Sequence, residues 1–278
     1  MEHIENIESL IRVLARSEST HGLFIKGPPG IGKSTCVEEA LKSLSLPYVM
    51  AGTYSSPLGL YNALSDVPHG ALTVIDDAGG LFQGISLDVL KAALAPSAGT
   101  SGARIVEWQS TAQCVKVPSF EFDGKIIILT NWFPETKSMR ALIDRCFSYK
   151  IEPTRKELSE LLSKISEKED RFPNREAVAI ALKFLLKKLA EESMAQDEIN
   201  LRALNRLYEI VDAAPESWER LAHVIFSGKN PDSVIGELSR SGQSANRQAK
   251  EFSARTGLSE RTFWNRRKKV LGAAEATI

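Results

Sequence analysis

Uninterrupted apolar runs recur through the first half of the chain and end in polar turns. They occupy residues 22–27, 46–53, 71–77 and 125–129. A continuous apolar pattern is typical of strands buried on both faces of a parallel sheet. Helices are expected at residues 1–19, 34–45, 56–65 and 87–95, and residues 138–150 read as a helix followed by a strand. This order of elements predicts an α/β domain with a parallel sheet over residues 1–152.

From residue 153 to residue 228 the pattern is helical throughout, with no strand-like run. The change comes at Glu152-Pro153-Thr154, where Thr154 can cap a new helix. Further helices are expected at residues 154–168, 174–193, 200–211 and 217–226. We interpret this second region as a small all-α lid.

A third region covers residues 229–278. Its first part, to residue 246, is rich in Gly, Ser, Asn and Pro and reads as a linker with one short helix at 231–239. Helices at 246–256 and 260–271 then flank the tight turn Gly257-Leu258-Ser259. This pattern is typical of a helix-turn-helix, whose second helix enters a DNA major groove. Its apolar contacts are expected from Phe252, Leu258, Phe263 and Val270.

The first candidate chemistry lies in the run Gly27-Pro28-Pro29-Gly30-Ile31-Gly32-Lys33-Ser34-Thr35. It fits the P-loop pattern Gly-x-x-x-x-Gly-Lys-[Ser/Thr] and stands between a predicted strand and a predicted helix, as that motif requires. Its backbone N–H groups and the helix N-terminus would bind phosphates. Lys33 adds a charge on the same oxygens, and Ser34 would ligate Mg²⁺. The alternative is a glycine-rich turn that binds nothing.

Two carboxylates, Asp76 and Asp77, end the apolar run at 71–77. Ligands of open α/β sheets bind at the carboxyl ends of the strands, which is where both residues fall. Asp76 fits the Walker B position that holds Mg²⁺ through water, and Asp77 fits the position that polarises the attacking water. A simple Asp-Asp turn after a strand is the alternative.

Asn131 ends the run that begins at residue 125 and could hydrogen-bond the attacking water or the γ-phosphate. Just before that run, residues 104–109 and 113–117 read as a hairpin joined by residues 110–112. Such a hairpin could project into the pore of a ring, with Lys116 or Arg104 available for phosphates. A surface hairpin without a ligand is equally consistent with the pattern.

Composition limits the classes of function. The chain is 43% hydrophobic and 25% charged, and its 35 basic and 35 acidic residues cancel, so a nucleic-acid surface requires local charge segregation. Three widely separated cysteines argue against a disulfide framework, and four scattered histidines show no metal-ligand spacing. Because no apolar run reaches about 18 residues and the charged N-terminus is no signal peptide, we expect a cytoplasmic protein without membrane contacts.

Charge segregation is found over residues 240–270, where basic residues outnumber acidic ones. The basic residues are Arg240, Arg247, Lys250, Arg255, Arg261, Arg266, Arg267, Lys268 and Lys269, against Glu251 and Glu260. Base or phosphate contacts are expected from Arg261, Thr262, Asn265 and Arg266. The alternative is a basic tail that packs on the rest of the protein or keeps it soluble.

Together these motifs resemble the AAA+ ATPases over about residues 20–228. The matching residues are GPPGIGKST, VIDD as Walker B, LTN with Asn131 as sensor 1, DRC with Arg145, and NLR with Arg202. The resemblance implies a sheet of strand order 5-1-4-3-2, a helical lid, and a ring or filament of hexamer-like size with ATP at subunit interfaces. The Asp-Asp pair resembles DnaA-like initiators, the hairpin resembles superfamily 3 helicases, and the compact size suits a phage or plasmid replication ATPase.

The resemblance also gives the arginines a role. Arg145 lies where oligomeric AAA+ proteins carry the arginine finger that reaches a neighbouring subunit's γ-phosphate, and Arg140 is the other candidate. Arg202 stands at a plausible sensor-2 position, with Arg206 as its competitor. The alternative for each is a surface or ion-pairing arginine.

Two hypotheses follow from the sequence. The first is a homo-oligomeric, Mg²⁺-dependent AAA+ ATP hydrolase that couples ATP binding and hydrolysis to action on DNA, of the replication-initiation, helicase or helicase-loader type. The second is a protein-remodelling or regulatory ATPase whose C-terminal tail binds a protein partner. Both place ATP and Mg²⁺ at the P-loop.

Overall fold

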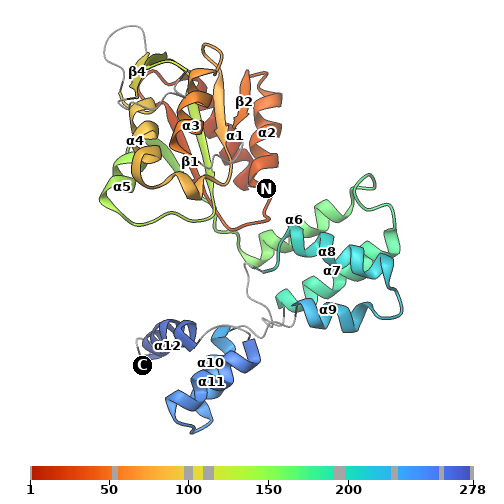
Figure 1. Cartoon of the computed structure of the whole chain (residues 1–278). Coiled ribbons are helices and arrows are strands. Elements are labelled where there is room, and N and C mark those ends of the chain that lie inside the picture. The colour runs from red at the N-terminus through yellow and green to blue at the C-terminus, as the bar shows by residue number, and fades with distance from the viewer. Residues whose placement is uncertain are drawn as a thin grey trace. The chain divides into compact units, whose positions relative to one another are not determined.

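The computed structural model describes residues 2–51, 56–96, 103–108, 116–190, 198–226, 231–256 and 260–275. The chain divides into two compact units, Met1–Glu152 and Pro153–Ile278 (Figure 1). Within the described residues, no helix is long and apolar enough to cross a membrane. The predicted division of the chain into three domains stays a prediction.

A parallel sheet of five strands forms the centre of the first unit. Its strands are β1 (Gly22–Lys26), β2 (Tyr48–Ala51), β3 (Leu72–Ile75), β6 (Lys125–Thr130) and β7 (Cys146–Lys150). They lie in the order β2-β3-β6-β1-β7. If these five strands are numbered 1 to 5 in chain order, their order is the expected 5-1-4-3-2. The strands β4 (Arg104–Glu107) and β5 (Ser119–Phe122) lie outside this sheet. The predicted α/β fold class is confirmed.

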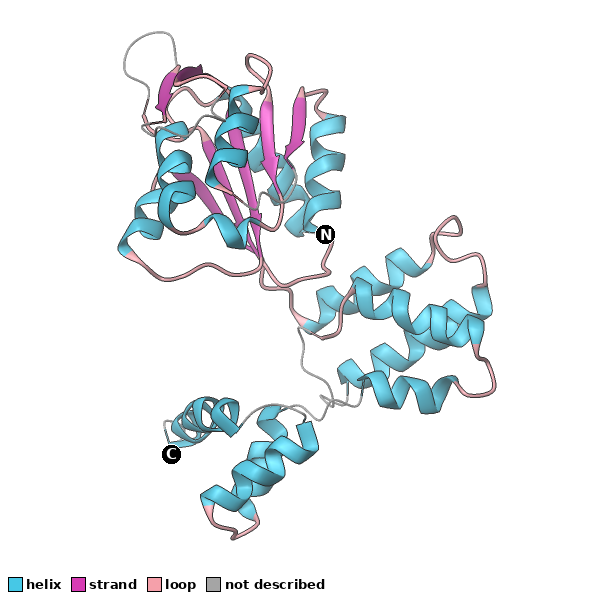
Figure 2. Ribbon diagram, in the orientation of Figure 1, coloured by secondary structure: helices cyan, strands magenta, loops and turns pink. Residues whose placement is uncertain are grey.

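Helices cover both faces of this sheet (Figure 2). Those of the first unit are α1 (Glu2–Arg16), α2 (Lys33–Ser43), α3 (Pro57–Ser65), α4 (Gly84–Ala93) and α5 (Lys137–Ile143), with a 3₁₀ turn at Ala78–Leu81. Helices α3, α4 and α5 share one apolar core with β3 and β6. Helix α1 packs against α2 and β1, and buries Ile7, Ile11 and Leu14. The sequence places Ser56 as the N-cap of α3, and its side chain accepts from Gly59 N at 3.1 Å.

Strands β4 (Arg104–Glu107) and β5 (Ser119–Phe122) form a separate antiparallel hairpin. In the chain it follows β3 and precedes β6. The predicted hairpin therefore exists, but its second strand was misplaced. Lys116 and Val117 lie outside any strand, and residues 109–115 lie outside the described residues. Arg104 pairs with Phe122 in the ladder. One face of the hairpin is buried, because Arg104, Val106 and Phe122 are the buried positions and the residues between them are more exposed.

Arg104 is a structural residue, so the expectation that it could meet phosphates is wrong. Its side chain is 3% exposed, its Nε donates to Ala93 O at 3.0 Å, and a terminal nitrogen donates to Gly124 O. Burial lowers the pKa of Arg104 to about 10, which leaves it charged at neutral pH. It fastens the hairpin to the end of α4 and to the start of β6.

Buried positive charge surrounds His21 at the entrance to β1. Burial, and then the charges of Arg104 and Lys125, lower the pKa of His21 from 6.5 to about 4. The ammonium of Lys125 in turn donates to Leu14 O, Ala15 O and Ser17 O at 2.6, 3.0 and 2.6 Å. These carbonyls end α1, so Lys125 caps that helix from the sheet. His21 is therefore held neutral in the folded chain.

Acid should destabilise the protein partly through His21. Between pH 6.5 and pH 4 the unfolded chain takes up a proton on His21 that the folded chain does not. The free energy of unfolding should therefore fall as the pH falls through this window, by roughly 1 kcal/mol per pH unit. Urea unfolding at pH 7 and pH 5 measures the loss. His21→Gln should show a smaller loss than the wild type, and an equal loss would remove His21 from the explanation.

The second unit is all helical within its described residues. Its helices are α6 (Arg155–Ser166), α7 (Arg175–Ala190), α8 (Leu201–Ala213), α9 (Trp218–Phe226), α10 (Pro231–Arg240), α11 (Ala245–Thr256) and α12 (Glu260–Glu275). Thr154 caps α6 in a full capping box with Glu157. Helices α10, α11 and α12 share an apolar cluster of their own, which includes Phe252, Phe263 and Val270.

Candidate nucleotide-binding site

The loop between β1 and α2 has the backbone that a phosphate cradle needs. Gly30 and Gly32 have φ angles of 70° and 86°, in the left-handed region that glycine adopts without strain. A Cβ on Gly27 would lie 3.0 Å from Ile151 Cβ, so the loop runs close to the residue that follows β7. Gly32 is the N-cap of α2 and has no side chain to accept from the first N–H groups. The N–H groups at the start of such a helix are suited to binding an anion.

Lys33 connects the loop to the neighbouring strand. Its ammonium donates to Gly27 O at 2.9 Å, to Pro28 O at 2.8 Å and to Asn131 Oδ1 at 2.7 Å. A lysine has three donors, and each of these bonds uses an acceptor beside the loop. Since β1 pairs in parallel with β6, the ends of both strands meet here. The structure thus brings together two predicted site residues, Lys33 and Asn131, that are far apart in the sequence.

Ser34 and Asp76 form the second contact of the site. The Ser34 hydroxyl donates to Asp76 Oδ2 at 2.5 Å, which joins the start of α2 to the end of β3. A hydroxyl and a carboxylate oxygen side by side are the hard oxygen ligands that Mg²⁺ takes, together with water and phosphate oxygens. Among the described residues no group of three or more His, Cys, Asp and Glu residues could hold a metal ion. The Ser34 hydroxyl and the Asp76 carboxylate fit a Mg²⁺ ion whose remaining ligands are water and phosphate oxygens.

Asp77 is exposed and holds an unusual backbone conformation. Its φ and ψ are 52° and 46°, and its N–H donates to Asp76 Oδ1 at 2.9 Å. Left-handed backbone is uncommon for a residue with a side chain, although Asp and Asn adopt it more readily than most. This turn directs the chain into the 3₁₀ turn Ala78–Leu81. The exposed carboxylate of Asp77 stays next to the partly buried carboxylate of Asp76.

Thr130 is a contributor that the sequence analysis missed. It is buried, its hydroxyl donates to Trp132 O at 2.6 Å and accepts from Trp132 N at 3.2 Å, and its carbonyl accepts from Gly27 N at 3.1 Å. These bonds fix the turn on which Asn131 sits and tie it to the P-loop. The signal in the sequence was the threonine directly before Asn131, a residue type that bonds to nearby backbone.

Arg145 lies at the other end of the sheet from the P-loop. The residue after it, Cys146, pairs with Gly22 at the first position of β1, whereas the loop follows the last position. At about 3.3 Å per residue the two ends are roughly 15 Å apart, more than an arginine side chain spans. A terminal nitrogen of Arg145 donates to Ala141 O in α5. The structure therefore does not bring Arg145 together with Lys33 of the same chain, and Arg140 is exposed on α5.

The remaining arginine candidates belong to the second unit and are described within it. Arg202 is exposed in the first turn of α8. The guanidinium of Arg206 lies 5.5 Å from the centre of the Phe226 ring, and its Nε donates to Arg202 O at 3.4 Å. Arg206 is therefore engaged with α9, whereas the sensor-2 role of Arg202 stays a prediction.

The expected DNA contacts divide into exposed and paired residues. Arg261 and Asn265 are exposed one turn apart on α12, with Thr262 partly buried beside them. Arg266 pairs with Asp232 of α10 at 3.1 Å. Phe252 and Phe263 pack with ring centres 5.4 Å apart, while Leu258 and its turn lie outside the described residues. Lys116, which precedes β5 in the loop that joins the two hairpin strands, pairs with Asp66. Their roles on DNA stay predictions.

Solved structures resemble nearly the whole chain. The RuvB Holliday junction branch migration motor of Thermotoga maritima is 15% identical, with a TM-score of 0.51, and the match covers 99% of this chain and 87% of that one. A point mutant of the same protein is 14% identical, with a TM-score of 0.54, over 98% and 88% of the two chains. No protein-family model matches the chain, and no curated protein matches it in sequence. The likeness defines the fold as that of the AAA+ ATPases.

Proposed function

We propose that the chain is a Mg²⁺-dependent, homo-oligomeric AAA+ ATPase that couples ATP binding and hydrolysis to action on DNA, of the replication-initiation, helicase or helicase-loader type. The observation that carries the ATPase part is the bonding of Lys33 between the P-loop carbonyls and Asn131, beside the Ser34–Asp76 pair. These contacts join the ends of β1, β3 and β6 in one place, where ligands of open α/β sheets bind.

Each residue of this site then has a task. The N–H groups of the loop and of the first turn of α2 hold the phosphates, and Lys33 adds its charge to them. Ser34 would ligate Mg²⁺ and Asp76 would hold it through water, and the ion would supply neutralisation of charge on the phosphate oxygens. Asp77 orients the attacking water and draws its proton, while Asn131 donates to that water or to the terminal phosphate. The neighbouring subunit supplies Arg145.

Action on DNA is supported by charge and exposure on α12. Arg261 and Asn265 lie exposed one turn apart on the second helix of the helix-turn-helix pattern. Arginine pairs with guanine and asparagine with adenine in the major groove, so these side chains are suited to reading bases. The neighbour in the structure comparison is described as a branch migration motor for Holliday junctions, which are DNA.

The double variant Arg261→Gln/Asn265→Ala tests the DNA part. We expect its affinity for duplex DNA to fall at least about tenfold, because each base contact is worth roughly 1–3 kcal/mol. ATP binding should stay unchanged, measured with Lys33→Ala as the negative control for nucleotide binding. Arg220→Gln removes an exposed charge from α9 and should leave DNA affinity unchanged. ATPase activity that stays flat on adding DNA, with no salt-sensitive binding, would contradict the proposal.

A second candidate function is protein remodelling, with the tail on a protein partner. It is favoured by Trp264, whose side chain is 40% exposed on α12, and by the ion pair that engages Arg266 within the tail. Deleting residues 229–278 separates the two functions. Under the first, binding of duplex DNA collapses while nucleotide binding survives, and under the second there is no duplex-DNA affinity to lose.

A further inference from the structure

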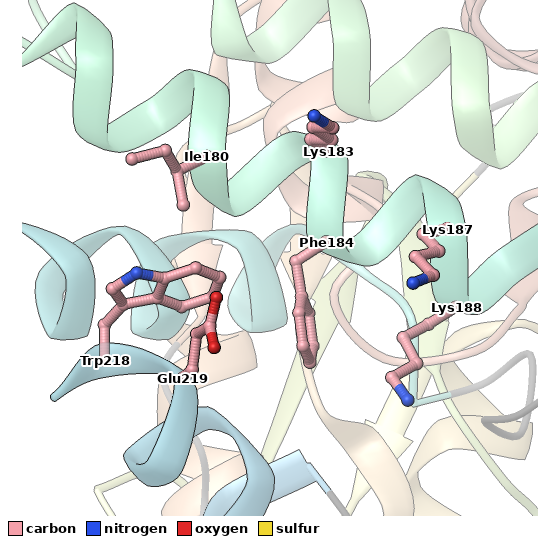
Figure 3. A pocket seen from close by; sticks show the side chains of 7 residues that line it. All are labelled: Ile180, Lys183, Phe184, Lys187, Lys188, Trp218 and Glu219. Carbon is pink, nitrogen blue, oxygen red and sulfur yellow. The ribbon is translucent and has the colours of Figure 1, made fainter.

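A groove of about 430 Å³ lies between α7 and the start of α9, and no part of the proposed function uses it. The residues that line it are Ile180, Lys183, Phe184, Lys187, Lys188, Trp218 and Glu219 (Figure 3). The α7 members follow the spacing i, i+3, i+4, i+7 and i+8, which places them on one stripe of the helix. The stripe combines charged and aromatic side chains, whereas a helix face packed in a core would be apolar.

Positive charge dominates the rim of this groove. Lys183 and Lys187 are exposed, and the ammonium of Lys188 lies 5.5 Å from the centre of the Phe184 ring. Lys183 and Lys187 are about 6 Å apart along the helix axis, which is similar to the separation of successive phosphates in an extended single strand. Three ammonium groups against one carboxylate fit an anionic ligand.

Aromatic rings form one wall of the groove. The rings of Phe184 and Trp218 meet edge to face with centres 6.0 Å apart, and Phe226 supports Phe184 from α9 at 6.4 Å. In Figure 3 the indole of Trp218 extends from α9 toward α7, below Ile180. Trp218 is only partly buried. An unpaired base could stack on its ring, an interaction that tolerates any base.

Glu219 favours a nucleic-acid strand over an acidic peptide as the ligand of this groove. It is exposed in the first turn of α9, beside Trp218. Its carboxylate would repel an acidic side chain placed beside Trp218. A nucleic-acid strand instead turns its phosphates to the lysines and its bases to the opposite side. There the amino group of cytosine can donate to a carboxylate, whereas thymine has no amino group to offer.

We propose that the α7–α9 groove binds single-stranded DNA, with phosphates on Lys183 and Lys187, a base stacked on Trp218, and Glu219 favouring cytosine over thymine. This site differs from α12, where duplex DNA is expected. A duplex cannot use the groove, because its bases are already stacked and paired. The choice of DNA over RNA rests on the proposed function. The binding of a single strand by the lysines, Trp218 and Glu219 does not.

The lysines are tested with the double variant Lys183→Gln/Lys187→Gln in the full chain. Affinity for short oligodeoxycytidine should fall, and the slope of log affinity against log salt concentration should become shallower by about 1.4, because each phosphate contact contributes about 0.7. Lys164→Gln/Lys168→Gln makes the same charge change on exposed lysines near the end of α6, outside the groove, and should leave the slope unchanged. Equal slopes in both variants would overturn the proposal.

The ring and the carboxylate are tested separately. Trp218→Ala should weaken oligodeoxycytidine binding roughly 5- to 100-fold, as loss of one stacked base does, and Trp218→Phe should restore most of it. Because Glu219 is exposed, Glu219→Gln should leave the fold intact. It should reduce the preference for oligodeoxycytidine over oligodeoxythymidine, at a pH above 7 where cytosine is unprotonated. A wild type without that preference would overturn the role of Glu219.

Competing ligands complete the test. Polyglutamate of matched charge should compete poorly, and competition equal to that of oligodeoxycytidine would assign the groove to acidic peptides. Much tighter binding of oligoribocytidine would assign it to RNA. Duplex binding and ATP binding, followed in the same preparations, report on the proposed function. A loss of single-strand binding in groove variants that keep both activities can therefore only concern this site.

Discussion

Asp77→Asn should bind ATP with unchanged affinity and lose turnover by a factor of at least about 100. In the proposed reaction the Asp77 carboxylate orients the attacking water and draws its proton, and removal of a positioned base costs about 10²–10⁴ in rate. The amide of asparagine has nearly the same shape but cannot take the proton. Binding of a labelled nucleotide and release of phosphate measure the two effects independently.

The backbone makes asparagine the right replacement at position 77. Asp77 has φ 52° and ψ 46°, a conformation that asparagine tolerates and alanine does not. Asp77→Asn should therefore unfold at the same temperature as the wild type, while Asp77→Ala should lose about 1 kcal/mol of stability. Unchanged turnover in a well-folded Asp77→Asn protein would exclude Asp77 from the chemistry.

Arg145→Ala should bind ATP and fail to hydrolyse it, with a loss on the order of 10³ or more in turnover. The loss would come from the missing guanidinium charge on the transition state. Arg145 lies at the opposite end of the sheet from the P-loop of its own chain. If Arg145 acts on a phosphate, that phosphate belongs to a neighbouring subunit. Arg140→Ala on the preceding helix is the matched control and should retain most of the activity.

Mixing two inactive proteins tests whether Arg145 acts between subunits. In a mixed oligomer, an Asp77→Asn subunit can offer its intact Arg145 to the intact Asp77 of an Arg145→Ala subunit. A mixture should therefore recover part of the activity that neither variant has alone. Since Arg145 also donates to Ala141 O, thermal unfolding of Arg145→Ala is measured first. A folded variant with full turnover would leave Arg140 as the remaining candidate.

Much of the first unit could be predicted because its signals are local. Continuous apolar runs indicated the sheet strands, since a strand buried on both faces must be apolar at every position. The P-loop residues and Asp76 follow strands directly, so a parallel sheet brings them to one edge. The same logic placed Asn131 there. The contact between Lys33 and Asn131 Oδ1 needed the structure, because it depends on the turn that Thr130 holds.

The sequence predictions failed where contacts between distant residues, and not the local sequence pattern, determine the structure. Residues 113–117 look like a strand, but the strand that pairs with Arg104–Glu107 is Ser119–Phe122, whose Phe122 is buried. Arg104 looks like a phosphate ligand, and its burial between backbone carbonyls was not visible in the sequence. The groove between α7 and α9 was also missed, because it joins Phe184 to Trp218 across two helices.

The attachment of the β4–β5 hairpin has a mechanical consequence. Only two residues separate β5, which ends at Phe122, from β6, which begins at Lys125. Arg104 also clamps the first arm to Gly124, between the two strands. This short and bonded connection leaves the hairpin little freedom to move relative to β6. A pull on the hairpin is therefore transmitted along β6 to Asn131 beside the phosphate loop, instead of being absorbed by a compliant loop.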